Sequence, residues 1–298
     1  MFYITLLFLI LFYVCISITL YFYSYSSPGI KRIKDLEKIK EEYTKKIIGN
    51  KRLIIGGSDV LYAFNTNEMN KQLKVPTINY GTNVGMGIGY LLDFAMKNLK
   101  EGDQVILCLA YSLYYKKPYD IFAFEYYRMY DKKKLKRFSL RDKIFYFFGN
   151  MKLNFSYVQK KFEITNCGAY VKVRGTNLES KKEKPLNFPN EFKKTNSIRK
   201  LEEFKDFCLE NNIDIKLTFP STLYFSCYMD SLYLEGLYEY LNTEFNCIGK
   251  PKCFFVPKEQ IYNSVYHVNE IGQNIRTNHL INYLKIEEAA NNNDQKNV

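Results

Sequence analysis

The sequence contains very little histidine. His267 and His279 are the only two, and the seven cysteines include no Cys-x-x-Cys pair. Zinc clusters need several cysteine and histidine ligands at short spacings, so the composition argues against such a cluster and we expect no bound metal. The same scarcity leaves only two positions for an imidazole base, if the chain uses one in catalysis.

Charged side chains are absent from the beginning of the chain. Residues 2–23 form an uninterrupted apolar and aromatic run with no polarity beyond Ser and Thr. A membrane-spanning helix needs about 20 such residues, whereas a helix in a soluble core would carry a polar face. The run exceeds the ~7–15 apolar residues of a usual signal peptide, and no Lys or Arg precedes it. We therefore predict an uncleaved membrane anchor within residues 1–29.

Basic residues follow the apolar run, and the positive-inside rule places such a flank and the chain after it in the cytoplasm. They are Lys31, Arg32, Lys34, Lys38 and Lys40. The formal net charge is +12, with further basic concentrations at 132–137 and 181–184. No nucleic-acid-binding motif accompanies this charge, so we expect no nucleic-acid partner. The basic side chains fit a solvated surface, or one that faces anionic lipid or glycan.

Strands and helices alternate in the first half of the chain. Residues 30–50 have a helical period and predict a stalk, and the domain follows over 51–286. Apolar strands are predicted at 53–55, 75–80 and 104–110, with helices after the first two and a glycine-spaced turn at 81–89. This alternation predicts a three-layer α/β/α sandwich with a mainly parallel sheet and right-handed crossovers.

The rhythm breaks between about 118 and 196. This aromatic and basic stretch predicts an insertion of helices with an irregular β piece at 162–173. Its aromatic residues fit a hydrophobic core, or a lid or acceptor platform that stacks on sugars and acyl chains. Beyond it we expect a helix capped by Ser197, strands at 213–219 and 253–256, helices at 232–241 and 270–285, and a disordered tail at 287–298.

The cysteines do not identify the compartment. Cys247 and Cys253 flank a turn and could pair in an oxidising environment, whereas Cys15 and Cys108 lie in apolar runs that are typical of packed thiols.

Two phrases far apart in the sequence contain the residues that could carry chemistry. Gly56-Gly57-Ser58-Asp59 follows the first predicted strand, and active sites of parallel sheets gather at the carboxyl ends of strands. A serine hydroxyl needs a base before it becomes a nucleophile, and His267 lies just before the last helix. Both residues also have plain structural interpretations, Ser58 in a turn and His267 at a helix entry. Asp59 fits an N-cap, and His279 fits a surface or packed histidine.

The order of three phrases resembles the SGNH (GDSL-like) hydrolase superfamily. They are the Gly-Gly-Ser-Asp phrase at 56–59, Asn-Tyr-Gly-Thr-Asn-Val-Gly at 79–85, and Asn-Ser-Val-Tyr-His-Val-Asn-Glu-Ile-Gly at 263–272. The chain looks most like the membrane-anchored members found with bacterial surface-polysaccharide and envelope acylation systems. The resemblance covers about 52–110 and 262–284.

The resemblance implies an SGNH/flavodoxin-like fold and a division of roles. Ser58 would be the nucleophile and His267 the general base. Gly85, or Val84 one position earlier, would offer an oxyanion N–H, and Asn83 could donate its amide. Such an enzyme needs no cofactor.

The sequence departs from the family pattern at two places. Asn263 stands where relatives carry the acid that orients histidine, and Ala-Tyr-Ser at 110–112 replaces a Gly-x-Asn block. An asparagine can hold an imidazole but cannot stabilise imidazolium as a carboxylate does, an exchange that has cost about 10⁴ in turnover in a serine triad. The site is therefore a weakened or differently completed enzyme, or one that has lost activity.

Three functions stay open at this point. The first is a serine acyltransferase or esterase acting on O-acyl groups of an envelope carbohydrate, outside the cytoplasm, with a membrane acyl-donor protein as a candidate partner. The second is a catalytically inactive binding or assembly protein of envelope glycan biosynthesis with the same fold. The third is an accessory of envelope biosynthesis on the cytoplasmic face, which the basic flank alone favours.

Overall fold

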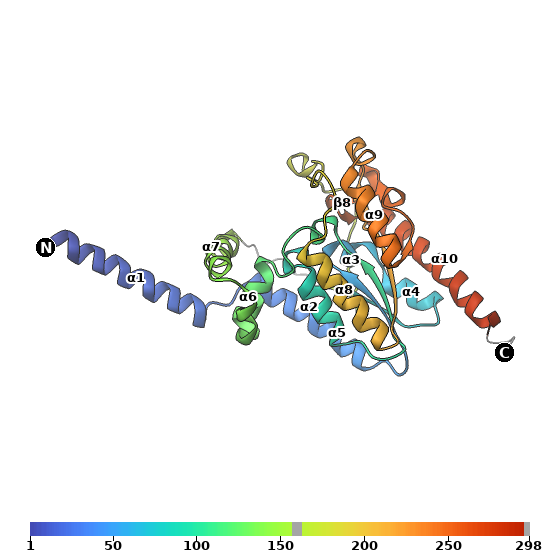
Figure 1. Ribbon diagram of the computed structural model, residues 1–298, viewed down its shortest axis with the longest axis horizontal. Helices are drawn as coiled ribbons and strands as arrows, with labels where there is room; N and C mark the ends of the chain where they lie inside the picture. The colour runs from blue at the N-terminus through green and yellow to red at the C-terminus, as the bar shows by residue number, and fades with distance from the viewer. Residues whose placement is uncertain (157–162, 295–298) are drawn as a thin grey trace. The chain divides into compact units, whose positions relative to one another are not determined.

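The computed structural model of the chain describes residues 1–156 and 163–294 (Figure 1). The chain divides into two compact units. One contains residues 1–32 and 121–160, and the other contains residues 33–120 and 161–298.

A parallel sheet forms the centre of the second unit. Its strands β1 (Arg52–Gly56), β2 (Thr77–Gly81), β3 (Gln104–Cys108), β4 (Asp214–Thr218) and β6 (Asn246–Ile248) lie in the order β2-β1-β3-β4-β6. All four pairings are parallel, with Ile54 opposite Asn79 on one side and Ile106 on the other. This confirms the predicted fold class, a mixed α/β domain around a mainly parallel sheet flanked by helices.

Helices pack on the sheet through alternating strand residues. Ile54 and Ile106 are buried in one cluster with Leu280, Ile281 and Leu284 of α10 (Glu270–Asp294). Helices α3 (Ser58–Ala63) and α4 (Thr66–Gln72) pack against α10. Helices α5 (Ile88–Met96) and α8 (Asn196–Glu210) pack on each other, α5 on β1 and α8 on β4, and α9 (Leu232–Glu244) packs on β6.

Two small strand pairs lie outside the main sheet. Strand β5 (Thr222–Leu223) pairs in parallel with β7 (Phe255–Val256), and β8 (Ile261–Ser264) pairs antiparallel with β9 (His267–Val268).

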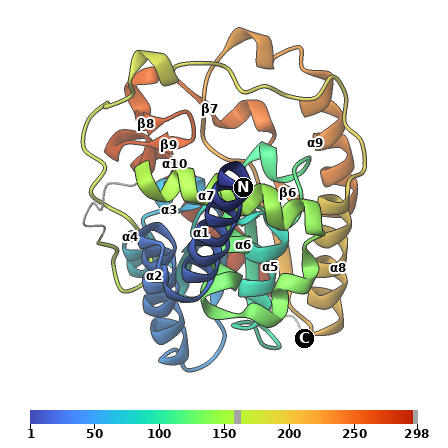
Figure 2. The same cartoon turned by 90° about the vertical axis from the view of Figure 1, so that its left-hand side faces the viewer.

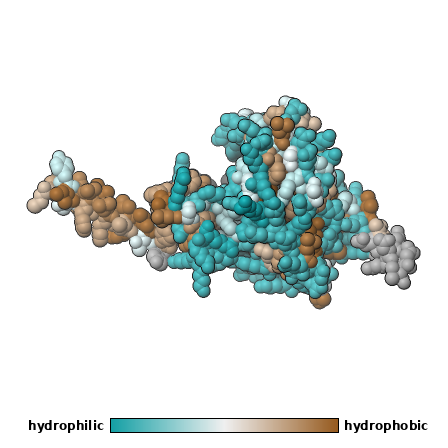
Figure 3. Space-filling model, in the orientation of Figure 1, coloured by the Kyte–Doolittle hydropathy of each residue, from teal (hydrophilic) through white to brown (hydrophobic). Residues whose placement is uncertain are grey.

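The first unit contains the N-terminal helix α1 (Phe2–Ser24), α6 (Ile121–Tyr130) and α7 (Leu140–Ser156). Within α1, residues Phe2–Phe22 are apolar and long enough to cross a membrane. Figure 3 shows hydrophobic side chains along this helix. The segment predicted as a stalk is α2 (Pro28–Lys45), in which Ile33, Leu36 and Lys40 are buried.

Four local predictions are wrong. The fifth strand of the sheet is β6, whereas 253–256 forms a 3-10 turn and the two-residue strand β7. Residues 163–173 contain no strand, because Gly168 (φ +89°) and a hydrogen bond from the Ala169 N–H to Thr165 build a turn there; Phe162 lies outside the described residues. The N-cap of α8 is Thr195, not Ser197. Helix α10 continues through Asp294 where a disordered tail was expected, and 295–298 lie outside the described residues.

All seven cysteines are free thiols, so Cys247 and Cys253 are not joined.

Candidate active site

Ser58 occupies the sharp turn between β1 and α3. A Cβ atom on Gly56 would lie 2.2 Å from the carbonyl oxygen of Cys108, and one on Gly57 would lie 2.4 Å from Cγ2 of Val84. Only glycine therefore fits at these two positions, where neighbouring backbone approaches the turn closely. The turn places Ser58 at the first position of α3, half-buried at the carboxyl end of the sheet.

A short hairpin presents His267 to this serine. Asn263 lies in β8, His267 begins β9, and Ser264 is the residue opposite His267 in the ladder. The hairpin tip is fixed by a hydrogen bond of 2.8 Å from the N–H of Leu223 to the carbonyl of Val265. The buried Val268 holds the hairpin against the core.

The structure brings Ser58, His267 and Asn263 together although Ser58 and His267 are 209 residues apart in the chain. His267 Nε2 lies 2.9 Å from Ser58 Oγ, and Nδ1 lies 2.7 Å from Asn263 Oδ1. An amide oxygen can only accept, so Nδ1–H donates to Asn263 and Nε2 keeps its lone pair for the serine hydroxyl. This is the tautomer that a general base requires.

Tyr62 packs against one face of the His267 imidazole. Its ring is parallel to that of His267, with 4.0 Å between centroids and 2° between planes. Tyr62 lies four residues after Ser58 in α3, so one helix face carries both side chains. We did not identify Tyr62 from the sequence. Its spacing from Ser58 was the signal that could have found it.

The electrostatics favour a neutral imidazole. Burial lowers the pKa of His267 to about 4, and Asn263 brings no charge that would raise it. The ring is therefore unprotonated at neutral pH, as a base must be. A base with so low a pKa also has a weak affinity for the serine proton.

Asp59 follows Ser58 in the chain but is not the carboxylate that would orient His267. Among the residues that the structure describes, the partners of the His267 ring nitrogens are Ser58 and Asn263. The Asp59 side chain is buried, and burial raises the pKa of its carboxyl to about 7. Its interpretation as an N-cap is wrong, since the N-cap of α3 is Gly57.

The residues proposed for an oxyanion hole bond to each other. The N–H of Gly85 donates to Oδ1 of Asn83 over 2.8 Å, so this N–H is engaged and the amide nitrogen of Asn83 is the group left to donate. The backbone nitrogen of Val84 would lie 2.9 Å from a Cβ on Gly57. Val84, the alternative by one register, thus lies beside the turn that carries Ser58. The oxyanion roles stay predictions.

Tyr111 is the middle residue of the Ala-Tyr-Ser stretch at 110–112. Its side chain is fully buried after β3, and its ring lies 6.4 Å from that of Tyr266. Within the described part of the chain, neither phenol hydroxyl has a hydrogen-bond partner. A buried donor without a partner is costly, and each such group in a native structure calls for an explanation.

His279 lies on the exposed surface of α10, where Arg276 and the edge of the Phe254 ring contact it. Among the described residues there is no cluster of three or more His, Cys, Asp or Glu side chains that could hold a metal ion.

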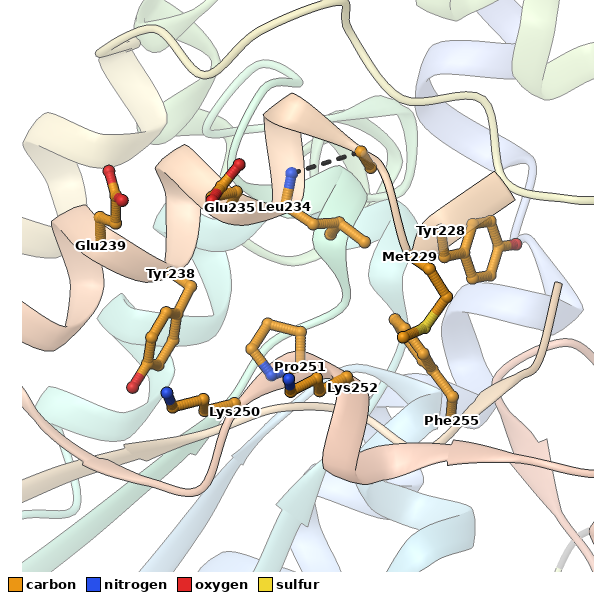
Figure 4. Close-up of a pocket in the computed structure, with 11 residues that line it drawn as sticks. Tyr228, Met229, Leu234, Glu235, Tyr238, Glu239, Lys250, Pro251, Lys252 and Phe255 are labelled. Atoms are coloured by element: carbon orange, nitrogen blue, oxygen red, sulfur yellow. Dashed lines mark hydrogen bonds between the residues drawn. The ribbon is translucent and has the colours of Figure 1, made fainter. Parts of the chain in front are cut away.

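A separate pocket of about 350 Å³ lies between α9 and the turn that precedes β7. Figure 4 shows Tyr238 and Lys250 at one side of it and Met229 and Phe255 at the other. The ammonium of Lys250 lies 5.5 Å from the centre of the Tyr238 ring. Ser58, Asn263 and His267 do not line this pocket.

No family model matches the chain, and no curated protein matches it. Among solved structures, the chain is similar to that of a proposed platelet activating factor from Streptococcus pneumonia. The two are 14% identical, the match covers 84% of this chain and 93% of the other, and the TM-score is 0.44. At this level of similarity, the function has to be inferred from the geometry of the site itself.

Proposed function

We propose that the chain is a membrane-anchored serine esterase or O-acyltransferase of the SGNH type, acting on O-acyl groups of an envelope carbohydrate. The observation that carries the proposal is the 2.9 Å contact between Ser58 Oγ and His267 Nε2, in the tautomer set by Asn263. A serine within reach of an oriented base is the arrangement that activates a hydroxyl for acyl transfer.

The reaction needs only groups of this chain and its substrates. Ser58 Oγ attacks the carbonyl carbon of an acyl ester while its proton passes to His267 Nε2. The ester C–O bond breaks, the leaving alcohol takes that proton, and the acyl group remains on Ser58. His267 then removes a proton from water or from a sugar hydroxyl, whose oxygen takes the acyl group. The bond to Ser58 Oγ breaks, and His267 returns the proton to that oxygen.

Two groups assist His267 in this account. Asn263 holds the imidazole by accepting from Nδ1, and Tyr62 stabilises the transient imidazolium through its π face at 4.0 Å. Three groups are candidates to donate a hydrogen bond to the oxyanion: the Val84 N–H, the Asn83 amide and the Tyr111 hydroxyl.

We place the catalytic domain outside the cytoplasm, where envelope glycans are, with α1 as its anchor. The basic residues after α1 favour the opposite side. The test is a fusion, after Ile48, to a reporter enzyme that is active only outside the cytoplasm. We expect this fusion to show reporter activity. A membrane acyl-donor protein would supply the acyl group.

A second candidate is an inactive binding or assembly protein of envelope glycan biosynthesis. It is favoured by the uncharged Asn263 and by the engagement of the Gly85 N–H with Asn83.

Hydrolysis of a small activated acetyl ester by the full-length chain in detergent tests the enzyme proposal. Ser58→Ala should abolish the hydrolysis and His267→Ala should bring it near background, while Ser180→Ala, at an exposed serine, should leave it unchanged. Equal rates in the Ser58 and Ser180 variants would favour the binding protein instead.

A further inference from the structure

Helix α7 exposes large apolar side chains along one face. Leu140 is 74% exposed, Ile144 53% and Phe148 62%. Their spacing of four residues aligns them on one side of the helix, and Phe145, 69% exposed, widens this apolar stripe. Water-facing helices of soluble proteins carry polar residues on such a face.

The opposite face of α7 already has its own core. Tyr146 and Phe147 are buried there. The ring of Tyr146 lies 6.0 Å from that of Phe124 in α6 and 5.9 Å from that of Phe138. Asn150 Nδ2 donates to the carbonyl of Ile121 over 3.0 Å. The stripe is therefore a second apolar face on a helix that is already packed.

The helices α6 and α7 attach to the end of the apolar helix α1. Phe147 contacts Tyr21 and Phe22, with ring centroids 4.8 and 5.6 Å apart. The guanidinium of Arg128 donates to the carbonyls of Tyr21 and Tyr25, each over 2.7 Å. These bonds fall on backbone carbonyls at the end of α1, where helices run out of N–H donors of their own.

A buried ion pair fixes this junction. Arg128 and Glu125 are both about 1% exposed and form two hydrogen bonds of 2.7 and 3.0 Å. The Tyr21 hydroxyl donates to the same carboxylate over 3.1 Å. Such a charged, fully bonded junction holds α6 and α7 at a set place beside the last turn of α1.

Helix α7 runs crosswise to α1. Figure 1 shows α1 lengthwise and α7 nearly end-on, and Figure 2 shows α7 lengthwise where α1 points toward the viewer. A helix that spans a bilayer runs close to the membrane normal, so a crosswise helix at its end lies along the membrane surface.

Basic side chains accompany the stripe. Residues 131–143 contain seven Lys or Arg and two Asp. Lys133, Lys136 and Arg141 are exposed. A helix with apolar and aromatic residues on one face and Lys or Arg beside them is typical of segments that lie in a membrane interface and attract anionic lipid.

We propose that α7 and the basic turn before it (132–137) form an interfacial segment, with the apolar stripe in the headgroup region of the bilayer that α1 crosses and the basic residues against anionic lipid. The proposal rests on the membrane anchor and not on the proposed chemistry. It gives the insertion between β3 and α8 a role of its own, as the part of the chain that contacts the lipid surface.

The absence of tryptophan from the sequence offers a direct test. Phe148→Trp introduces a single indole into the stripe, and Leu209→Trp, at a residue 59% exposed on α8, is the matched control in the other unit. Phe8→Trp reports on α1 itself. Each full-length variant is placed in nanodiscs of phosphatidylcholine and phosphatidylglycerol, with and without lipids brominated in the upper acyl chain.

The expected result is blue-shifted indole emission from the Phe148→Trp chain that brominated lipid quenches several-fold more than emission from the Leu209→Trp chain. Emission from the Phe148→Trp chain that is quenched by iodide in water and not by bromolipid would overturn the proposal. Emission shielded from both quenchers would also overturn it, since a second copy or another protein surface would then cover the stripe. Strong bromolipid quenching of the Phe8→Trp chain in the same experiment separates these failures from failure of the anchor.

The basic residues have their own test. In the Phe148→Trp chain, Lys133→Gln with Lys136→Gln and Arg141→Gln should lower quenching in phosphatidylglycerol discs to the level found in pure phosphatidylcholine. The matched control changes the exposed Lys181, Lys182 and Lys184 to Gln and should leave the quenching unchanged. Equal quenching in both sets of variants would show that anionic lipid is not the partner of these residues.

Discussion

Tyr62 and His267 form a parallel ring stack with 4.0 Å between centroids, and the same short helix that carries Tyr62 also carries Ser58. The imidazole is thus held on its face by Tyr62 and at its edge by Asn263. The site has no carboxylate partner for His267 among the described residues, so its charge stabilisation must come from elsewhere. We expect the π face of Tyr62 to supply part of it.

Replacing Tyr62 should expose this contribution. Tyr62→Leu removes the π face and should lower kcat roughly 3- to 30-fold, the range expected for loss of a cation–π contact of ~0.5–2 kcal/mol. Tyr62→Phe keeps the face and should retain most of the rate. Steady-state kinetics on an acyl ester measure both, and equal losses in the two variants would assign the effect to the hydroxyl rather than to stacking.

Asn263→Asp should raise activity and shift its pH dependence. A carboxylate beside Nδ1 favours imidazolium, so the pKa of His267 should rise from about 4. The rate gain should be on the order of 10- to 100-fold, from a charge pair at moderate effective dielectric.

The pH profile of kcat/KM separates this effect from a general improvement. In the unmodified chain the rate should stay level from neutral pH down to about 5, because His267 remains unprotonated until pH about 4. In the Asp variant the acidic limb should move to higher pH. A gain in rate without this movement would mean that position 263 acts on loop geometry and not on the charge of the imidazole.

Tyr111→Phe distinguishes a catalytic hydroxyl from an idle one. The Tyr111 hydroxyl is buried without a partner among the described residues, so removing it should stabilise the fold by about 1 kcal/mol whatever its role. If the hydroxyl donates to the oxyanion, kcat should fall by about 10²- to 10³-fold, as when one such donor is lost. Thermal unfolding and kinetics on the same sample give both answers. If the Tyr111→Phe chain is more stable and fully active, the oxyanion donors would be the Val84 N–H and the Asn83 amide.

Asp59 predicts a pH dependence of stability. Its folded pKa of about 7 lies above the value of 3.8 for an unburied aspartate, so the folded chain keeps a proton that the unfolded chain releases. Stability should therefore fall as pH rises from about 4 to 7, by up to about 1.4 kcal/mol per pH unit. Asp59→Asn should flatten this slope, while Asp206→Asn, at an exposed carboxylate, should keep it. Melting temperatures measured in detergent between pH 5 and 8 give the two slopes.

The sequence was sufficient for the central sheet because its strands are apolar and alternate with helices. Leu53 to Ile55 and Val105 to Leu107 are buried, as is typical of strands in a parallel sheet that helices cover on both faces. The edge strand β6 escaped prediction because Asn246-Cys247-Ile248 is short and partly exposed, whereas the more apolar 253–256 fills a turn. Apolar content alone does not separate a short strand from a buried loop.

The convergence of Ser58 and His267 could be expected only from the order of the family-like phrases. Nothing in local periodicity indicates that a hairpin beginning at Ile261 folds back onto the first strand-to-helix turn. The end of α10 could not be predicted from local composition either. The Asn-rich composition suggested disorder, whereas the helix continues from residues that pack on the sheet.

The intact mass of the full-length chain after reaction with an activated fluorophosphonate tests the central claim most directly. The reagent forms a stable bond to a serine oxygen only when a neighbouring base removes its proton, with release of fluoride. The account predicts a single adduct on Ser58 that is lost in Ser58→Ala and greatly slowed in His267→Ala. An unmodified chain, or an adduct that persists in Ser58→Ala, would contradict it.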